Sequence, residues 1–118
     1  MTIRISAAFA CTLLALLTPG HAAEWKPIQG SFALTAQNYL DPAPGEPVDS
    51  HIRFQLTGRA ARDLFAAMKV APTTDECTGA VAKRVGEMQC LHYKAPHRYE
   101  CSFAIAVMAQ KIEHGIAC

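Results

Sequence analysis

Two histidines, His92 and His97, lie on either side of an expected turn in the C-terminal third of the chain. Imidazole nitrogens are common ligands of Zn and Cu, so a pair that meets across a turn could hold either metal. The spacing reveals no third ligand, although Glu100 and His114 are candidates. The pair is a weak candidate metal site, and the sequence predicts no resident cofactor.

Catalytic signatures are missing from the chain. Ser31 and Ser102 belong to no nucleophile motif, and no phosphate-binding loop or HExxH pattern occurs. Asp75 and Glu76 are adjacent acids, and solvation in a loop is the simpler interpretation of such a pair. A reaction needs a convergent set of groups, so the sequence predicts that the protein is not an enzyme.

A stretch between two cysteines carries residue types typical of protein interfaces. Tyrosine and arginine are enriched at binding hot spots, and a turn stiffened by proline loses little entropy on binding. An ordinary hairpin turn with solvated cations is the competing interpretation. The candidate partner-binding residues are Leu91, His92, Tyr93, Lys94, Pro96, His97 and Arg98.

Four cysteines, Cys77, Cys90, Cys101 and Cys118, follow the apolar N-terminus, and they predict two disulfides in an oxidising compartment. Hairpin arithmetic places Cys101 opposite either Cys90 or Cys118. The favoured pairing is Cys77–Cys90 with Cys101–Cys118. The pairing Cys90–Cys101 with Cys77–Cys118 is nearly as well supported.

Residues 1–22 have the order of a secretory signal peptide. Arg4 precedes an apolar run from Ile5 to Leu17, and small residues stand at positions −3 and −1 of a cut before Ala23. The run is shorter than the roughly 20 residues of a membrane span. The sequence therefore predicts an exported protein, periplasmic or secreted, without stable membrane insertion after cleavage.

Cleavage of the first 22 of 118 residues leaves 96, the size of a single small domain over 23–118. Arg4 is the only residue among those removed that counts in the formal charge, so the net charge falls from +1 to 0. A neutral chain gives no reason to expect nucleic acid as a partner. Another protein is the expected partner, and the oligomeric state stays open.

Apolar alternation predicts strands over 31–37, 49–57, 88–94, 98–107 and 111–118, and a strand or helical turn over 80–85, with a strand favoured. Residues 40–48 contain three prolines and predict a loop. In 49–57, Arg53 and its alternate neighbours should form a wet face. Residues 59–70 predict one amphipathic helix with Leu64 and Phe65 as anchors, Thr57 as N-cap and Pro72 beyond its end.

These elements predict an α+β fold: an antiparallel sheet of about five strands, one main helix on one face, and two disulfides. Arg59, Arg62, Lys69, Lys83 and Arg84 should form a solvated basic surface. The leading function is an exported protein that recognises another protein, such as an inhibitor of a hydrolase or an immunity protein. The alternatives are a periplasmic metal-binding or hydrolytic protein using His92 and His97, and an envelope protein without a discrete ligand.

Overall fold

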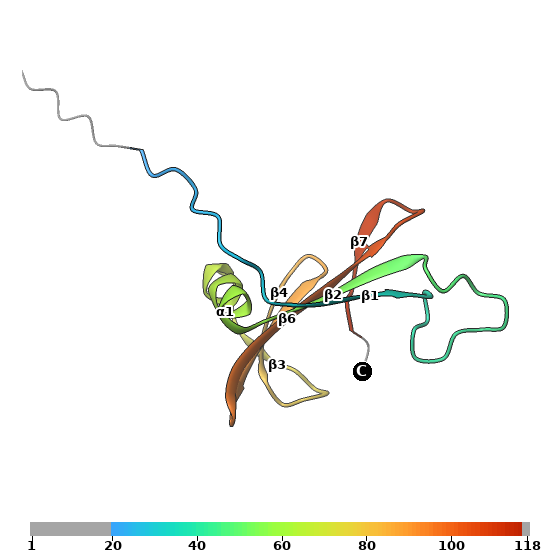
Figure 1. Cartoon of the computed structure of the whole chain (residues 1–118). Helices are drawn as coiled ribbons and strands as arrows, with labels where there is room; N and C mark the ends of the chain where they lie inside the picture. The colour runs from blue at the N-terminus through green and yellow to red at the C-terminus, as the bar shows by residue number, and fades with distance from the viewer. Residues whose placement is uncertain (1–19, 117–118) are drawn as a thin grey trace, which may run out of the picture.

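The computed structural model describes residues 20–116, which form one antiparallel sheet and one helix (Figure 1). The elements follow the chain as β1 (Gly30–Thr35), β2 (His51–Thr57), α1 (Gly58–Ala67), β3 (Thr73–Thr74), β4 (Val81–Val85), β5 (Met88–Lys94), β6 (His97–Ala106) and β7 (Lys111–Glu113). The α+β class is as predicted. Among these residues, no helix is long and apolar enough to cross a membrane.

The sheet has seven strands rather than about five. Its order is β1-β2-β6-β5-β4-β3, and β7 pairs with β6 beside this path. The two-residue strand β3 was not predicted, because Thr73 and Thr74 carry no alternating pattern and become a strand only by pairing with β4. Residues 81–85 are a strand, as favoured from the sequence.

Helix α1 begins where β2 ends, and its start is held by the preceding segment. Thr57 occupies the N-cap position but makes no side-chain cap hydrogen bond, so the predicted capping role is wrong. Gln29 replaces it: its side-chain oxygen accepts from the Arg59 backbone N–H at 2.9 Å. Gly58 has a φ of +60°, a backbone conformation that residues with a side chain rarely adopt, so glycine is favoured at this junction.

The helix ends at Ala67, three residues earlier than predicted. Met68 has an extended backbone, and its N–H donates back to the carbonyl of Leu64. Ala61 and Met68 are buried against the sheet, whereas the predicted anchors Leu64 and Phe65 are partly buried beside them. The core thus lies between α1 and the adjoining ends of β2, β5 and β6, where Leu56, Cys90 and Cys101 are buried.

The face of β2 that was predicted to be wet is covered. The C-terminal segment crosses it, and a Cβ on Gly115 would lie 2.5 Å from the backbone nitrogen of Phe103. The Arg53 guanidinium donates to the backbone oxygens of Gln37 and Gly115 at 2.8 and 3.0 Å. On the same face, His51 is buried and its Nε2 lies 3.0 Å from Glu113 Oε2.

Strand β7 is shorter than the predicted strand 111–118. Its pairing register with β6 also differs from the register predicted from the position of the turn. Ala106 pairs with Lys111, so the turn centres between Met108 and Ala109, one residue before the predicted position. The predicted alignment of Cys101 with Cys118 is therefore wrong. Cys118 itself lies outside the described residues.

Candidate functional site

The β5–β6 hairpin projects its tip past the helix end of the sheet and carries all seven candidate binding residues. Lys94 pairs with His97, so Ala95 and Pro96 form a two-residue turn with a cis peptide bond between them. Residues 94–98 are exposed, and residues 91–93 are half-buried. The predicted turn and its register are confirmed.

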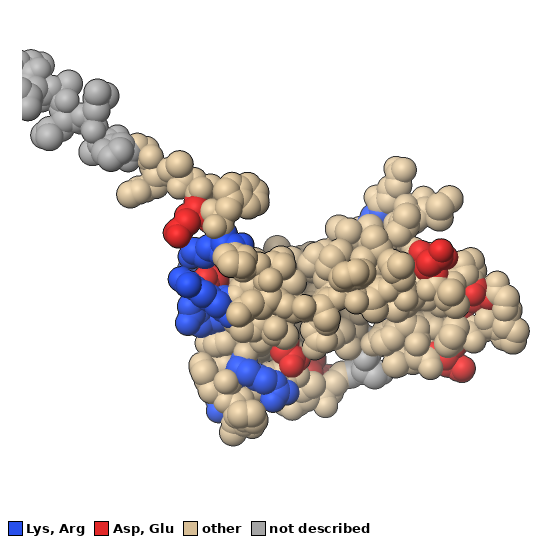
Figure 2. Space-filling model, viewed as in Figure 1, with Lys and Arg blue, Asp and Glu red and all other residues tan. Residues whose placement is uncertain are grey.

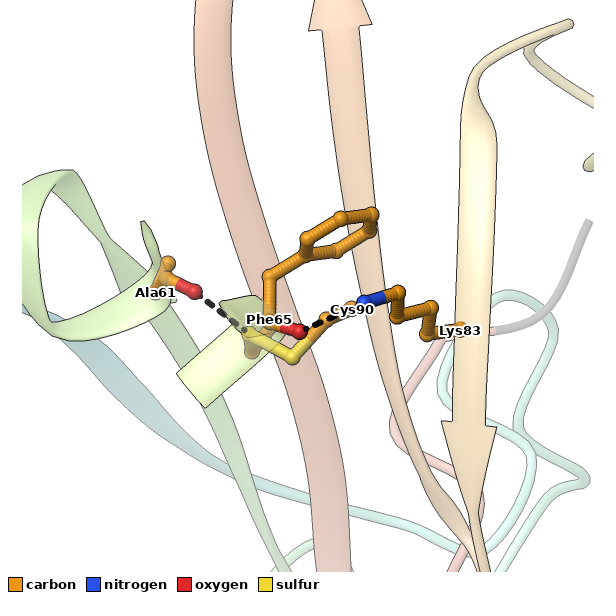
Figure 3. The surroundings of a disulfide bond; sticks show 5 residues. Ala61, Phe65, Lys83 and Cys90 are labelled. Atoms are coloured by element: carbon orange, nitrogen blue, oxygen red, sulfur yellow. Dashed lines mark hydrogen bonds between the residues drawn. A yellow bond between two sulfur atoms is a disulfide. The ribbon is translucent and has the colours of Figure 1, made fainter. Parts of the chain in front are cut away.

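A disulfide between Cys90 and Cys101 joins the two strands below the tip (Figure 3). The two residues are direct neighbours across the ladder, with 4.0 Å between their Cα atoms. The favoured pairing of Cys90 with Cys77 is therefore wrong, and the alternative is correct for this bridge. Both half-cystines are fully buried, and Cys101 Sγ lies 3.5 Å from the Ala61 carbonyl oxygen of α1.

The end of α1 is fastened to β4 beside the hairpin. Lys83 Nζ donates to the backbone oxygens of Phe65 and Met68, both at 3.1 Å, and lies 4.5 Å from the centre of the Phe65 ring (Figure 3). A cation at a helix C-terminus stabilises the carbonyls that lack helical partners. Lys83 was predicted to belong to a solvated basic surface, and its position at the helix end corrects that prediction.

The helix-side face of the tip is a stack of rings. His92 lies parallel to Tyr99 with 4.3 Å between ring centres, and Phe65 of α1 contacts both rings at 5.8 and 5.4 Å. His97 lies at the outer end, with its Nδ1 atom 3.0 Å from Nε2 of His92. Loss of hydration lowers the pKa of His92, and the neighbouring His97 and Lys94 lower it further. His92 therefore stays neutral at neutral pH.

The opposite face of the tip carries a cation over a ring. The Arg98 guanidinium lies 4.0 Å from the centre of the Tyr93 ring, directly across the ladder. Arg98 also donates to Glu100 at 3.4 Å, an ion pair that leaves both side chains partly exposed. The cation–π contact and the ion pair hold Arg98 in one orientation before any partner binds.

A cavity of about 360 Å³ lies behind Tyr93 on this face. It brings together Asp75, Arg84, Glu100 and His114, which come from four separate segments. Asp75 accepts from Thr78, whose hydroxyl lies 2.6 Å away, and this bond is the main cause of the lowered pKa of Asp75. From the sequence, Asp75 was predicted only to be a solvated acid in a loop. No local pattern indicates that these four segments, far apart in the chain, come together in the fold.

The three histidines of the candidate metal site are not brought together. His114 lines the cavity on the Tyr93 face, whereas His92 and His97 lie on the helix side of the hairpin. Glu100 also faces the cavity. Within residues 20–116, no group of three or more potential ligands could hold a metal ion. The His92–His97 pair therefore has no third protein ligand in the described part of the chain.

The fold and the site together define an α+β protein that presents an exposed hairpin. The hairpin is braced by a disulfide and by α1, the one helix within residues 20–116. Comparisons of the chain with family models, with curated proteins and with solved structures give no significant match.

Proposed function

We propose that this is a small exported protein that binds another protein through the tip of its β5–β6 hairpin. The observation that carries the proposal is an exposed tip on a braced base. Residues 94–98 are exposed, while the disulfide below them and the rings of Phe65 and Tyr99 fix the strands. A recognition surface ordered in advance loses less conformational entropy when it binds.

The chemistry of the tip favours an acidic partner surface. Lys94 and Arg98 are cations on an exposed turn, and Arg98 is paired with Glu100. Tyr93 adds a ring whose orientation is fixed by Arg98. Tyrosine and arginine are the residue types that most often dominate binding energy, and a guanidinium binds carboxylates through two parallel hydrogen bonds.

Replacement of Tyr93 and Arg98 by alanine should abolish partner binding and leave the fold intact. Neither side chain belongs to the buried core, so the melting temperature should stay within a few degrees of the wild type. Two hot-spot residues contribute on the order of 4 kcal/mol, about a thousandfold in affinity. Affinity capture from the exporting cell, with quantitative mass spectrometry, measures the loss.

The matched control is Arg62→Ala, which removes an exposed arginine from α1 and leaves the hairpin unchanged. A genuine partner is retained by the control and lost with the double variant. The proposed role of the tip is contradicted if the wild type, the double variant and the Arg62→Ala control all capture the same proteins in equal amounts. It is also contradicted if none of the three captures a partner.

Export and a second disulfide belong to the same proposal. Residues 1–19 and Cys118 lie outside the described part of the chain, so the support is the sequence: a signal-like N-terminus and an even number of cysteines in 23–118. We expect a mature protein beginning at Ala23 with Cys77 bonded to Cys118. Intact mass and non-reducing peptide mapping should find this N-terminus and a mass lower by four hydrogens than the fully reduced chain. A retained leader, or free thiols, contradicts it.

A further inference from the structure

One face of the sheet is apolar and only partly covered by α1. Register places Phe32, Phe54 and Phe103 in one row across β1, β2 and β6, and the rings of Phe54 and Phe103 stack at 4.8 Å. The next row contains Leu34, Ile52, Ile105 and Ile112. These seven residues are called the apolar face. It shares its side of the sheet with α1, because Phe103 packs against the helix-covered core.

The apolar face is open over the strands that extend beyond α1 (Figure 1). Phe32 is 70% exposed, Leu34 58% and Ile112 50%. Together with the residues between them, they form an apolar patch on the order of a few hundred Å². The largest apolar patch on a typical soluble monomer is about 300–600 Å² and is often functional, and a stable interface covers about 800 Å² per partner.

The rim carries opposite charges at its two ends. At the α1 end, Lys26, Arg59 and Arg62 surround Asp63, and Glu24 lines the same surface. At the other end, the loop between β1 and β2 contains Asp41, Glu46 and Asp49 without any lysine or arginine, and the nearby cation Lys111 of β7 is paired with Glu113. Figure 2 shows cations gathered beside the helix and acids on the loop at the far end, with a further cation near β7.

From this arrangement we propose that the apolar face binds a second copy of the chain, face to face and head to tail. A two-fold axis between the sheets and perpendicular to their strands brings the two apolar faces together. It also sets the cationic end of each copy against the acidic end of the other. The same surface then serves both partners, as two-fold symmetry requires.

The thickness of the helix layer above the sheet is compatible with this packing. Two sheets packed face to face lie about 10 Å apart, and a helix is about 10 Å in diameter. The second sheet therefore lies in the same layer as α1, beside it. The hairpin tip belongs to the α1 end, since Thr57 at the end of β2 pairs with Glu100. A head-to-tail dimer places its two hairpin tips at opposite ends. The proposed dimer does not depend on whether the tips bind a partner.

Sedimentation velocity over a range of concentrations tests the dimer. The wild type should show a reversible equilibrium between monomer and dimer. Phe32→Glu should remain monomeric, with a dissociation constant raised at least a hundredfold, because each interface would bury two unpaired carboxylates. Ser31→Glu is the matched control: it adds the same charge to the same edge strand on the opposite face, and it should dimerise like the wild type.

A wild type that stays monomeric at its highest soluble concentration overturns the proposal, and so does a dimer that persists in Phe32→Glu. Equal loss in Phe32→Glu and Ser31→Glu overturns it too, because that result marks pairing through the edge of β1. Phe32 is mostly exposed, so its replacement should leave the circular dichroism spectrum and melting temperature unchanged.

Charge reversal tests the head-to-tail orientation. Asp41→Lys with Asp49→Lys, and separately Arg59→Glu with Arg62→Glu, should each weaken self-association about tenfold by placing like charges at both ends. An equimolar mixture of the two variants should form a heterodimer of wild-type affinity, since opposite charges then meet at both ends. A mixture no tighter than its components overturns the head-to-tail arrangement.

Discussion

Replacing Cys90 and Cys101 together by alanine should lower the free energy of unfolding by about 3 kcal/mol, the usual contribution of a bridge that closes a short loop. The sulfurs are fully buried between α1 and the sheet, so their loss also removes core contacts. For a domain of this size the melting temperature should fall by roughly 15 °C. Urea denaturation and calorimetry measure both changes.

Reductant provides the control for this prediction. It should lower the stability of the wild type by at least as much as the double replacement does. A double variant within 1 kcal/mol of the wild type would contradict a stabilising role for the bridge between Cys90 and Cys101.

Arg53→Met should destabilise the chain by about 3 kcal/mol, because its partly buried guanidinium makes several hydrogen bonds at once. It donates to Thr35 Oγ1 at 2.9 Å and to the carbonyl oxygens of Gln37 and Gly115. Methionine keeps most of the aliphatic stem and leaves these acceptors without their donor. Denaturant unfolding measures the loss, and hydrogen exchange should show faster opening around residues 37 and 114–116.

Arg62→Met is the comparison for Arg53. It removes an exposed arginine whose ion pair with Asp63 is solvated, so its effect should stay within 0.5 kcal/mol. Arg53→Lys should fall between the two, since an ammonium cannot reach all the acceptors of a guanidinium. Equal effects of Arg53→Met and Arg62→Met would contradict the bracing role of Arg53.

Local patterns located most of the longer elements of the fold. Alternation located β2, β5 and β6 within one or two residues, and the change of period located α1. The β5–β6 turn was also predictable, because Pro96 and the spacing of the two cysteines agree on one register. These signals depend on neighbours in the sequence, which is why they could be interpreted without the fold.

The coverage of the sheet was not predictable. Strand β6 carries apolar residues on both faces, with Phe103 on one and Ala104 on the other, so alternation could not tell which face is buried. Ala104 is fully buried under the C-terminal segment, and Phe103 borders the open apolar face. Arg53 looked solvated for the same reason: its acceptors are backbone carbonyls of distant segments, which leave no trace in the residue types.

The residues that line the cavity beside Tyr93 could not be predicted to lie together either. Asp75 and His114 were visible as residue types, but their meeting depends on how the C-terminal segment crosses the sheet. The pairing of Cys90 with Cys101 was an open alternative to the favoured pairing, and the β6–β7 turn lies one residue before the position that would align Cys101 with Cys118. A sequence cannot exclude such a slip when both registers place apolar residues inward.

The bridge at the base of the hairpin turns the tip into a covalent ring. Residues 91–100 lie between two joined cysteines, and Lys94 and Arg98 are exposed within them. A protease that cuts after either cation opens the ring without releasing a fragment, because the sulfurs still connect both sides. The severed ends stay close together, held by the surrounding ladder and the packed rings. Cleavage of the tip is therefore a local event that the rest of the molecule can survive.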